Sequence, residues 1–407
     1  MKIYKKIKKN LISALAGLSS VFLLSSCDGV IFDTIRDEVK LADAEITGDI
    51  QNIVRYTLNG KEHVFVSTGQ ISYRDIDGDL SLSKVSFSDF STPSGFVYSL
   101  AADSTNLYAL SLTIEKDDDG YNVGTERNLY CYDGSGWTKI WTASYDSTSS
   151  AILFSTNTPK PANRKAYFRT SKNITVKDES GNDTTERVPV VYELNGTTAL
   201  FDDDGNEAIA AKYLYKTSTS YPVGTLSDTA PSTTTQISNT LLSAYSCAYF
   251  NGSFYFSSAY AMATNETLES EATYIYYSSG DNVYYSTDAS TWTSVDLGCD
   301  VIYSMALTSD YLLAGTDSGI VHTALKADSS DAAIVAIPST GNADFSTNAD
   351  STLSSYYEVP SVLVIDPAKT ETNATIFASA VTSSTSASLG NVGLWSYFAS
   401  TGEWNRE

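Results

Sequence analysis

The chain has 407 residues with 48 acidic and 26 basic side chains, a formal charge of −22 that becomes −27 when the five lysines of residues 1–26 are left out. A surface of this sign repels phosphate backbones, which excludes nucleic-acid binding as a function. The chain has only four cysteines and two histidines, without CxxC spacing, which argues against a zinc site.

Residues 1–26 have the pattern of an export signal. The lysine-rich start "MKIYKKIKKN" precedes the apolar stretch "LISALAGLSSVFLL" and a few small residues. The run "LLSSC" resembles the bacterial lipobox, which implies cleavage before Cys27 and acyl chains on that cysteine. We therefore expect a signal peptide over 1–26 and a lipoprotein anchored in the bacterial cell envelope, on its periplasmic face or outer surface. No later stretch is apolar enough to span a membrane.

Residues 27–49 are expected to form a tether between the lipid and the folded domain. Ile35, Val39, Ala42 and Ile46 recur at helical spacing, which predicts a turn or two of helix. Gly48 supplies a stop, and the folded domain is expected to cover residues 50–407.

Short strand-like runs separated by polar turns fill this domain. The clearest repeat pairs "VYSLAADSTNLYALS" from Val97 with "IYSMALTSDYLLAGT" from Ile302, which align without a gap at an offset of 205 residues. A unit of about four strands can be outlined six times. The units cover residues 52–87, 97–141, 151–202, 244–295, 302–337 and 361–407.

These repeats predict an all-β fold, a β-propeller with six blades of four-stranded antiparallel sheets, because radial packing buries both faces of each sheet. With only six units in the domain, each unit is longer than a typical blade, so a propeller of seven blades is the alternative. The Ser/Thr-rich segment 217–240 is expected to be an exposed insertion, and it is also where a seventh unit would lie.

The run "STDASTW" resembles the Asp-box of BNR-type propellers. The resemblance implies a structural role for Ser286, Asp288, Thr291 and Trp292, on a hairpin between the third and fourth strands of a blade. There the Asp288 carboxylate can accept bonds from backbone N–H groups of the turn, and Trp292 is expected to be buried between blades.

Two degenerate copies of this motif, at 131–140 and 397–407, place Trp137 and Trp404 at equivalent positions. More widely, the sequence resembles secreted bacterial propeller lipoproteins, with a leader and a Ser/Tyr/Asp-rich body of spirochaete type. Because Asp-boxes occur in propellers of many functions, the resemblance implies a fold and no activity.

A calcium site is suggested by "DIDGDLS", where Asp75, Asp77 and Asp79 alternate as hard-cation ligands would. The EF-type loop then requires Gly and an acid where Leu80 and Ser86 stand, which favours a polar hairpin turn. No cofactor is expected. The odd cysteines Cys131, Cys247 and Cys299 allow at most one disulfide and are expected to be buried apolar residues.

Catalytic motifs are missing from the sequence. A sialidase needs an arginine triad, and none of the eight arginines begins an "RIP" motif. There is no GxSxG elbow, HExxH pair or P-loop. We therefore predict no enzyme but a lipid-anchored binding or scaffold propeller for a protein or glycan partner. The alternative is a cryptic glycan-active enzyme with carboxylates in the central depression, which acids clustered with an arginine would favour; a tyrosine-rich face would favour binding.

Overall fold

The computed structural model describes residues 46, 49–50, 52–76, 87–145, 151–241, 243–327, 334–336, 357–382, 392–399 and 403–407. Cys27 and most of the expected tether lie outside these residues, as do Asp77 and Asp79. Among the helices of the described part, none is long and apolar enough to cross a membrane.

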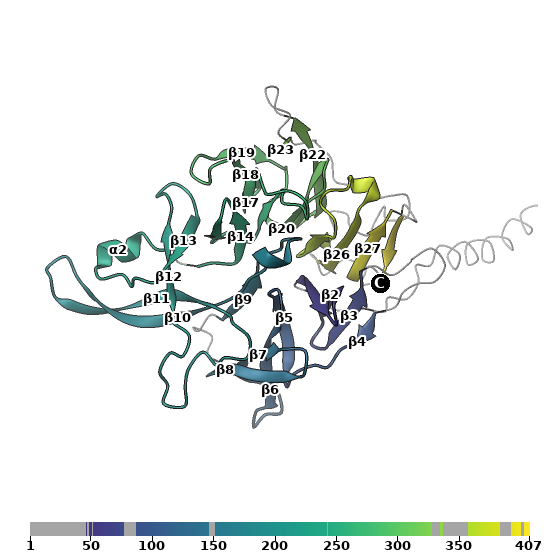
Figure 1. Cartoon of the computed structure of the whole chain (residues 1–407). Coiled ribbons are helices and arrows are strands. Elements are labelled where there is room, and N and C mark those ends of the chain that lie inside the picture. The colour runs from purple at the N-terminus through teal and green to yellow at the C-terminus, as the bar shows by residue number, and fades with distance from the viewer. Residues whose placement is uncertain are drawn as a thin grey trace, which may run out of the picture. The chain divides into compact units, whose positions relative to one another are not determined.

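Antiparallel sheets dominate the described chain, which confirms the all-β class and its four-stranded sheets (Figure 1). The first sheet contains β1 (Ile53–Leu58), β2 (Lys61–Ser67), β3 (Ile71–Asp75) and β4 (Ser88–Asp89). The second contains β5 (Phe96–Ala102), β6 (Leu107–Lys116), β7 (Asn122–Tyr132) and β8 (Trp137–Ser144). In both sheets the strands follow one another in chain order, and tight hairpins join β1 to β2 and β5 to β6.

A seven-stranded sheet follows, in the order β14-β15-β13-β12-β11-β10-β9. Its strands are β9 (Ile152–Ser155), β10 (Ala166–Lys177), β11 (Asp183–Glu193), β12 (Lys212–Lys216), β13 (Val223–Ser227), β14 (Ser246–Phe250) and β15 (Ser253–Ser257). The long β10–β11 hairpin projects outward on the left of Figure 1. A 3₁₀ turn, η1 (Pro161–Asn163), and a short helix, α2 (Thr234–Ser238), lie between strands.

The Ser/Thr-rich segment 217–240 is partly built into this sheet, unlike an exposed insertion. Strand β13 pairs with both β12 and β15. Val223 is fully buried, and a Cβ on Gly224 would come within 2.4 Å of the Tyr215 carbonyl oxygen. The short apolar run around Val223 therefore provides the strand contact, while the polar residues that follow it form α2.

Three further sheets complete the described chain. The first of these contains β16 (Met262–Thr264), β17 (Ile275–Ser279), β18 (Asn282–Ser286) and β19 (Thr293–Asp296). The second contains β20 (Ile302–Leu307), β21 (Tyr311–Thr316), β22 (Gly319–Ala327) and β23 (Ile334–Ala336). The last contains β24 (Tyr357–Glu358), β25 (Val362–Val364), β26 (Thr375–Thr382), β27 (Gly393–Phe398) and β28 (Glu403–Arg406), with a 3₁₀ turn η2 (Glu371–Asn373).

The interpretation of residues 244–295 as one unit is wrong. Strands β14 and β15 belong to the seven-stranded sheet, whereas β16 to β19 form a sheet of their own. A two-residue turn joins β14 to β15, and the turn after β17 is equally tight. In the sequence these residues therefore look like one series of hairpins, and nothing marks the change of sheet between β15 and β16.

The repeat seen in the sequence has a counterpart in backbone geometry. The two copies form β5–β6 and β20–β21, in each case the first two strands of a sheet. Both first strands carry a register shift at the same place in the repeat, between Val97 and Ser99 and between Ile302 and Ser304. A bulge adds local twist and redirects the side chains around it, here Tyr98 and Tyr303.

The first strands of the successive units meet around a common centre (Figure 1). Within the described residues, β1, β5, β9, β14, β16, β20 and β25 contact one another in that order, and β25 contacts β1. Apolar clusters fill the spaces between neighbouring sheets; one, for example, joins Phe65 of the first sheet to Leu100 of the second. Each sheet thus contributes apolar residues to at least one such cluster.

The last sheet is joined to the first by residues near the two ends of the described chain. The Ile46 N–H donates to the Glu407 carbonyl oxygen at 2.9 Å. Arg74 Nη1 lies 2.8 Å from Glu407 Oε1, with both side chains 2% exposed. Ile46, expected in the tether, is therefore buried against the sheets together with Ile50.

Candidate functional site

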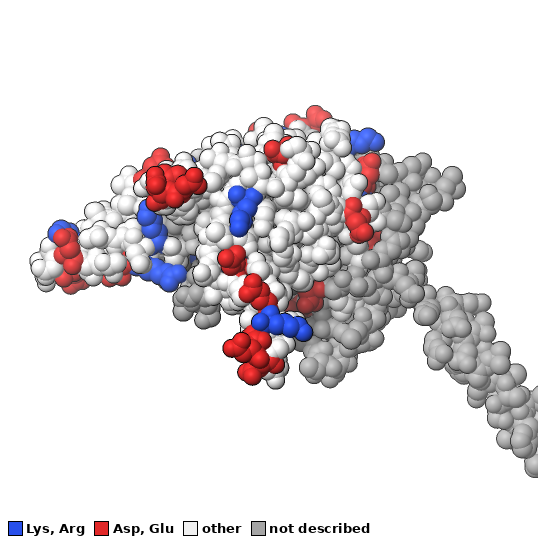
Figure 2. Space-filling model, turned by 90° about the horizontal axis from the view of Figure 1, so that it is seen from below, with Lys and Arg blue, Asp and Glu red and all other residues white. Residues whose placement is uncertain are grey.

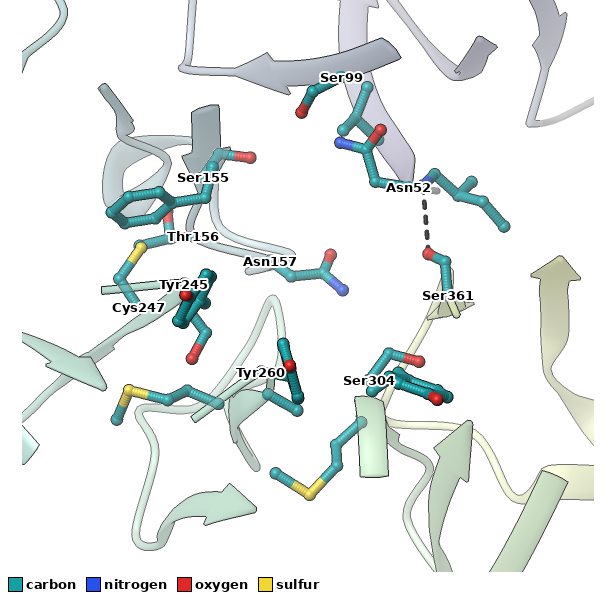
Figure 3. Close-up of a pocket in the computed structure, with 18 of the residues that line it drawn as sticks. Asn52, Ser99, Ser155, Thr156, Asn157, Tyr245, Cys247, Tyr260, Ser304 and Ser361 are labelled. Carbon is teal, nitrogen blue, oxygen red and sulfur yellow. Dashed lines mark hydrogen bonds between the residues drawn. The ribbon is translucent and has the colours of Figure 1, made fainter. Parts of the chain in front are cut away.

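A pocket of about 540 Å³ lies where the first strands meet (Figure 3). We call it the axial pocket, because every one of the seven first strands contributes to its lining. Tyr245, Tyr260 and Tyr303 lie at or just before the start of β14, β16 and β20, while later residues of the first strands, such as Arg55 of β1, lie deeper. The pocket therefore has two chemically different ends.

The polar groups of the pocket wall are largely engaged in bonds between neighbouring strands. The Asn52 side chain bonds to both backbone groups of Leu100, which joins β1 to β5. Ser99 Oγ donates to the Leu153 carbonyl oxygen at 3.2 Å, and the Ile53 N–H donates to Ser361 Oγ at 3.1 Å. These side chains hold the sheets together, so they are not free for a ligand.

Three tyrosines form the mouth of the pocket. Tyr260 and Tyr245 are 56% and 38% exposed, with ring centroids 5.5 Å apart. The Tyr303 ring follows at 5.9 Å from Tyr260, and burial raises the pKa of its hydroxyl. The Arg169 guanidinium lies over the Tyr245 ring at 5.4 Å and supports it from below the surface. We call Tyr245, Tyr260 and Tyr303 the tyrosine mouth.

Asn157 provides polar groups that the fold does not use. It lies in the loop after β9 and extends toward the middle of the pocket between the labelled tyrosines and Ser361 (Figure 3). Its side chain is exposed, and among the described residues it has no hydrogen-bond partner. The Ser155 hydroxyl, also in the lining, is likewise free within the described part of the chain.

Two buried arginines and a glutamate form the floor. Arg55 and Arg164 are 7% and 3% exposed, and both pair with the Glu62 carboxylate. Burial, followed by the charge of Arg164, lowers the pKa of Arg55 to about 10. Arg55 Nη2 also donates to the carbonyl oxygens of Val364 and Ile365. We call Arg55, Arg164 and Glu62 the arginine floor.

The loop between β9 and β10 reinforces this floor. Arg164 Nε and Nη2 donate to the carbonyl oxygens of Thr158 and Pro159 at 3.1 and 2.8 Å. The Thr158 hydroxyl bonds to Glu266, whose side chain is only 1% exposed and also accepts from Asn163 at 2.6 Å. The loop is thus fixed across the deep end of the pocket.

Two other cavities have similar volumes, about 520 and 570 Å³. The larger of these is bordered by Trp141 and Phe201, but its charged residues Lys172 and Glu207 pair with each other at 2.7 Å. Neither cavity collects residues from all the sheets. The axial pocket alone among the three does so, and for that reason we take it as the candidate site.

The Asp-box-like residues form a self-contained turn between β18 and β19. Asp288 Oδ1 accepts bonds from the N–H groups of Ser290 and Thr291 at 2.8 and 2.7 Å, and from the Ser286 hydroxyl at 2.9 Å. These bonds, the one from Thr291 first, hold the pKa of Asp288 well below its usual range. Trp292 is 8% exposed and meets the Tyr277 ring edge-on at 4.7 Å.

The counterparts of Trp292 occupy equivalent places at the start of the fourth strand. Trp404 in β28 is 2% exposed, which agrees with the expected burial. Trp137 in β8 is only half-buried, and its indole N–H donates to the Ser91 carbonyl oxygen at 2.8 Å. In the turn before Trp137, Asp133 Oδ1 accepts the Ser135 N–H at 2.9 Å, as Asp288 does in its own turn.

Many acids of the chain have the same structural role in other hairpins. Asp117, Asp178 and Asp202 each accept bonds from the backbone N–H groups two and four residues later, at 2.8 to 3.1 Å. In Figure 2 the acidic side chains lie in small separate groups with Lys and Arg among them, not on one continuous face. The negative charge is therefore spread over turns.

The other candidate residues are not brought together into a site. Asp75 lies at the end of β3 and pairs with Lys61 at 3.7 Å, while its two suggested calcium partners lie outside the described residues. Within the described ranges no group of three or more His, Cys, Asp or Glu could hold a metal ion. Cys131, Cys247 and Cys299 are free and buried.

Sequence reasoning missed both ends of the axial pocket. The tyrosines are three among 28, and Arg164 joins Arg55 and Glu62 of the first sheet from the distant loop between β9 and β10, so no local pattern marks them. The one available signal was Tyr303 in the repeat that begins at Ile302. The sequence matches no protein-family profile, and a search of curated proteins finds no match.

Proposed function

We propose that the chain is a seven-bladed β-propeller, lipid-anchored at Cys27 in the bacterial cell envelope, that binds a glycan or protein partner at its tyrosine mouth. Seven first strands in a closed circuit support seven blades over six. In this assignment the seven-stranded sheet is two blades joined edge to edge by β12 and β13.

The observation that carries the binding function is the make-up of the axial pocket. Its described lining contains no Asp or Glu, three tyrosine rings border its open end, and the free Asn157 amide extends into its middle from the loop after β9. Exposed aromatic rings beside a few unengaged polar groups are typical of a binding site. A glycosidase needs a pair of carboxylates near the scissile bond, and this lining offers none.

Binding can be tested with glycan and peptide arrays probed with the full chain in detergent micelles. The double variant Tyr245→Ala/Tyr260→Ala should reduce the signal on bound ligands at least tenfold. Tyr121→Ala is the matched control, because Tyr121 is 71% exposed in the turn between β6 and β7 and does not line the pocket. Binding that the double variant retains in full, or no binding on either array, contradicts the proposed site.

The anchor can be tested separately by metabolic labelling with a fatty-acid probe. Cys27→Ala should abolish the label, because lipidation requires the thiol at the cleavage point. Cys299→Ala, which removes one of the buried cysteines, should keep it. Undiminished label on the Cys27 variant would contradict lipid attachment at this residue and leave the pocket hypothesis intact.

A further inference from the structure

We propose that the ligand of the axial pocket is the uncharged end of a saccharide chain, stacked on the tyrosine mouth and hydrogen-bonded to Asn157. This inference rests on the proposed binding function and narrows its ligand class. It follows from three features of the pocket: the ring arrangement, the kind of free polar group, and the burial of the charged side chains.

The rings suit a ligand that is flat and partly apolar. Tyr245, Tyr260 and Tyr303 are successive neighbours at 5.5 and 5.9 Å, inclined by 48° and 57°, so they form a curved row instead of a closed stack. A sugar ring has C–H groups on its faces and hydroxyls on its rim. Tyrosine rings can cover such faces with little loss of conformational entropy, while their hydroxyls reach the rim.

The free polar groups suit hydroxyl ligands. The Asn157 amide has both a donor and an acceptor end, and the Ser155 hydroxyl can do either. A sugar hydroxyl also donates and accepts, so it can satisfy both ends of the amide at once. Neither side chain is used by the fold within the described residues, so a ligand would not have to break existing bonds.

The charged side chains of the pocket are buried and already bonded to protein groups. Arg164 uses all three of its nitrogens, on Thr158, Pro159 and Glu62. Arg55 uses its two terminal nitrogens, while its Nε has no hydrogen-bond partner but is enclosed by protein atoms. An anionic ligand would find no exposed cationic nitrogen, because both guanidinium groups are buried, and a cationic ligand would find no acid in the described lining. Either would lose hydration without a partner, which favours a neutral ligand.

The floor sets how the ligand enters. Because the loop from Thr156 to Arg164 crosses the deep end and is bonded to Glu266, the pocket is open at the mouth and blocked below. A chain must then enter end first. A peptide end carries a charge that this pocket does not match, whereas the non-reducing end of a neutral glycan carries only hydroxyls.

Isothermal titration of the full chain in micelles tests the inference. The probes are neutral trisaccharides of glucose, galactose and N-acetylglucosamine, acidic trisaccharides that contain uronic or sialic acid, and uncapped tripeptides. At least one neutral trisaccharide should bind. Its affinity should fall at least tenfold in Tyr260→Ala and in Asn157→Ala and stay unchanged in Tyr121→Ala. Tyr260→Phe, which keeps the ring, should lose less than Tyr260→Ala.

Two results would overturn the ligand class and leave the proposed function standing. These are tighter binding of an acidic trisaccharide or of a tripeptide than of any neutral trisaccharide, with the same dependence on Tyr260. The ligand class is wrong if no probe binds, or if the probes bind Tyr260→Ala and Asn157→Ala as tightly as wild type. If the array signals also survive in Tyr245→Ala/Tyr260→Ala, the tyrosine mouth is refuted as well.

Discussion

Tyrosines at the mouth of the axial pocket differ from tyrosines inside the sheets in surroundings, not in residue type. Tyr277 in β17 is 1% exposed and stacks on Tyr284 of the neighbouring strand with ring centroids 4.8 Å apart. Tyr260 is 56% exposed and touches only other mouth tyrosines among the ring contacts of the described chain. A tyrosine on a strand therefore does not by itself indicate a binding site. A tyrosine without a structural role does.

Alkaline pH should have the largest effect, through the interior tyrosines. Burial raises the pKa of Tyr56 and Tyr98 to about 12 and raises that of Tyr276 and Tyr277 as well. Since the unfolded pKa is about 10, the folded state holds protons that the unfolded chain releases. Stability is fully present below pH 10 and is lost as pH rises through 10 toward the folded values.

At pH 11 each such hydroxyl costs about 1 kcal/mol relative to pH 9, and several together are comparable with the whole stability of a domain. Urea unfolding followed by far-UV circular dichroism at pH 8 to 11 measures this loss. A midpoint that does not change up to pH 11 would show that the interior tyrosines are not buried as described.

Tyr277→Ala should have the next largest effect, a loss of about 3–5 kcal/mol in the free energy of unfolding, as for other large buried rings. The ring stacks on Tyr284 and meets Trp292 of the Asp-box-like turn edge-on, so its removal takes away both contacts. The control is Tyr277→Phe, which keeps the ring and should lose about 1 kcal/mol or less. Equal stability of the two variants would show that this ring does not support the sheet.

Much of the sheet structure could be predicted from sequence because it is local. Alternating apolar residues and Asp or Gly in the turns give hairpins such as that of Asp288, whose bonds to backbone N–H groups lie within residues 288–291. The division of 244–295 between two sheets depends instead on where Met262 finds a partner, in this case Tyr277. Strand pairing of that kind depends on residues that are distant in the sequence.

The candidate site was harder to predict for the same reason. Glu62 lies beside Arg55 in the first sheet, but Arg164 is about a hundred residues away and reaches Glu62 only when the circuit of strands closes. Asn157 stands in an unremarkable polar loop, "STNTPK", and nothing local distinguishes its free amide from an amide that caps a turn. Such groups become visible only when all bonded side chains have been accounted for.

Tyr108→Phe should have a moderate effect, a loss of about 1–3 kcal/mol. The Tyr108 hydroxyl donates to Asp103 at 2.8 Å and accepts the Gly196 N–H at 2.9 Å, which links the second sheet to the loop after β11. Phenylalanine keeps the ring and leaves the buried Asp103 and the half-buried Gly196 N–H without that bond. Urea unfolding measures the loss. If the variant is as stable as wild type, the hydroxyl is not the link between these sheets.

Tyr260→Ala should have the smallest effect on stability, within about 0.5 kcal/mol of wild type, because more than half of the side chain is already in water and its hydroxyl has no bond to lose among the described residues. The value matters because it is paired with a large effect on ligand binding. Truncating a residue that supports the fold lowers both stability and ligand binding. Truncating a residue that is kept free for a ligand lowers ligand binding alone. Urea unfolding and titration of the same preparation give the two numbers. A loss above about 1 kcal/mol would mean that Tyr260 steadies Tyr245 and Tyr303 as part of the structure, and the contrast between mouth and interior would no longer separate binding from folding.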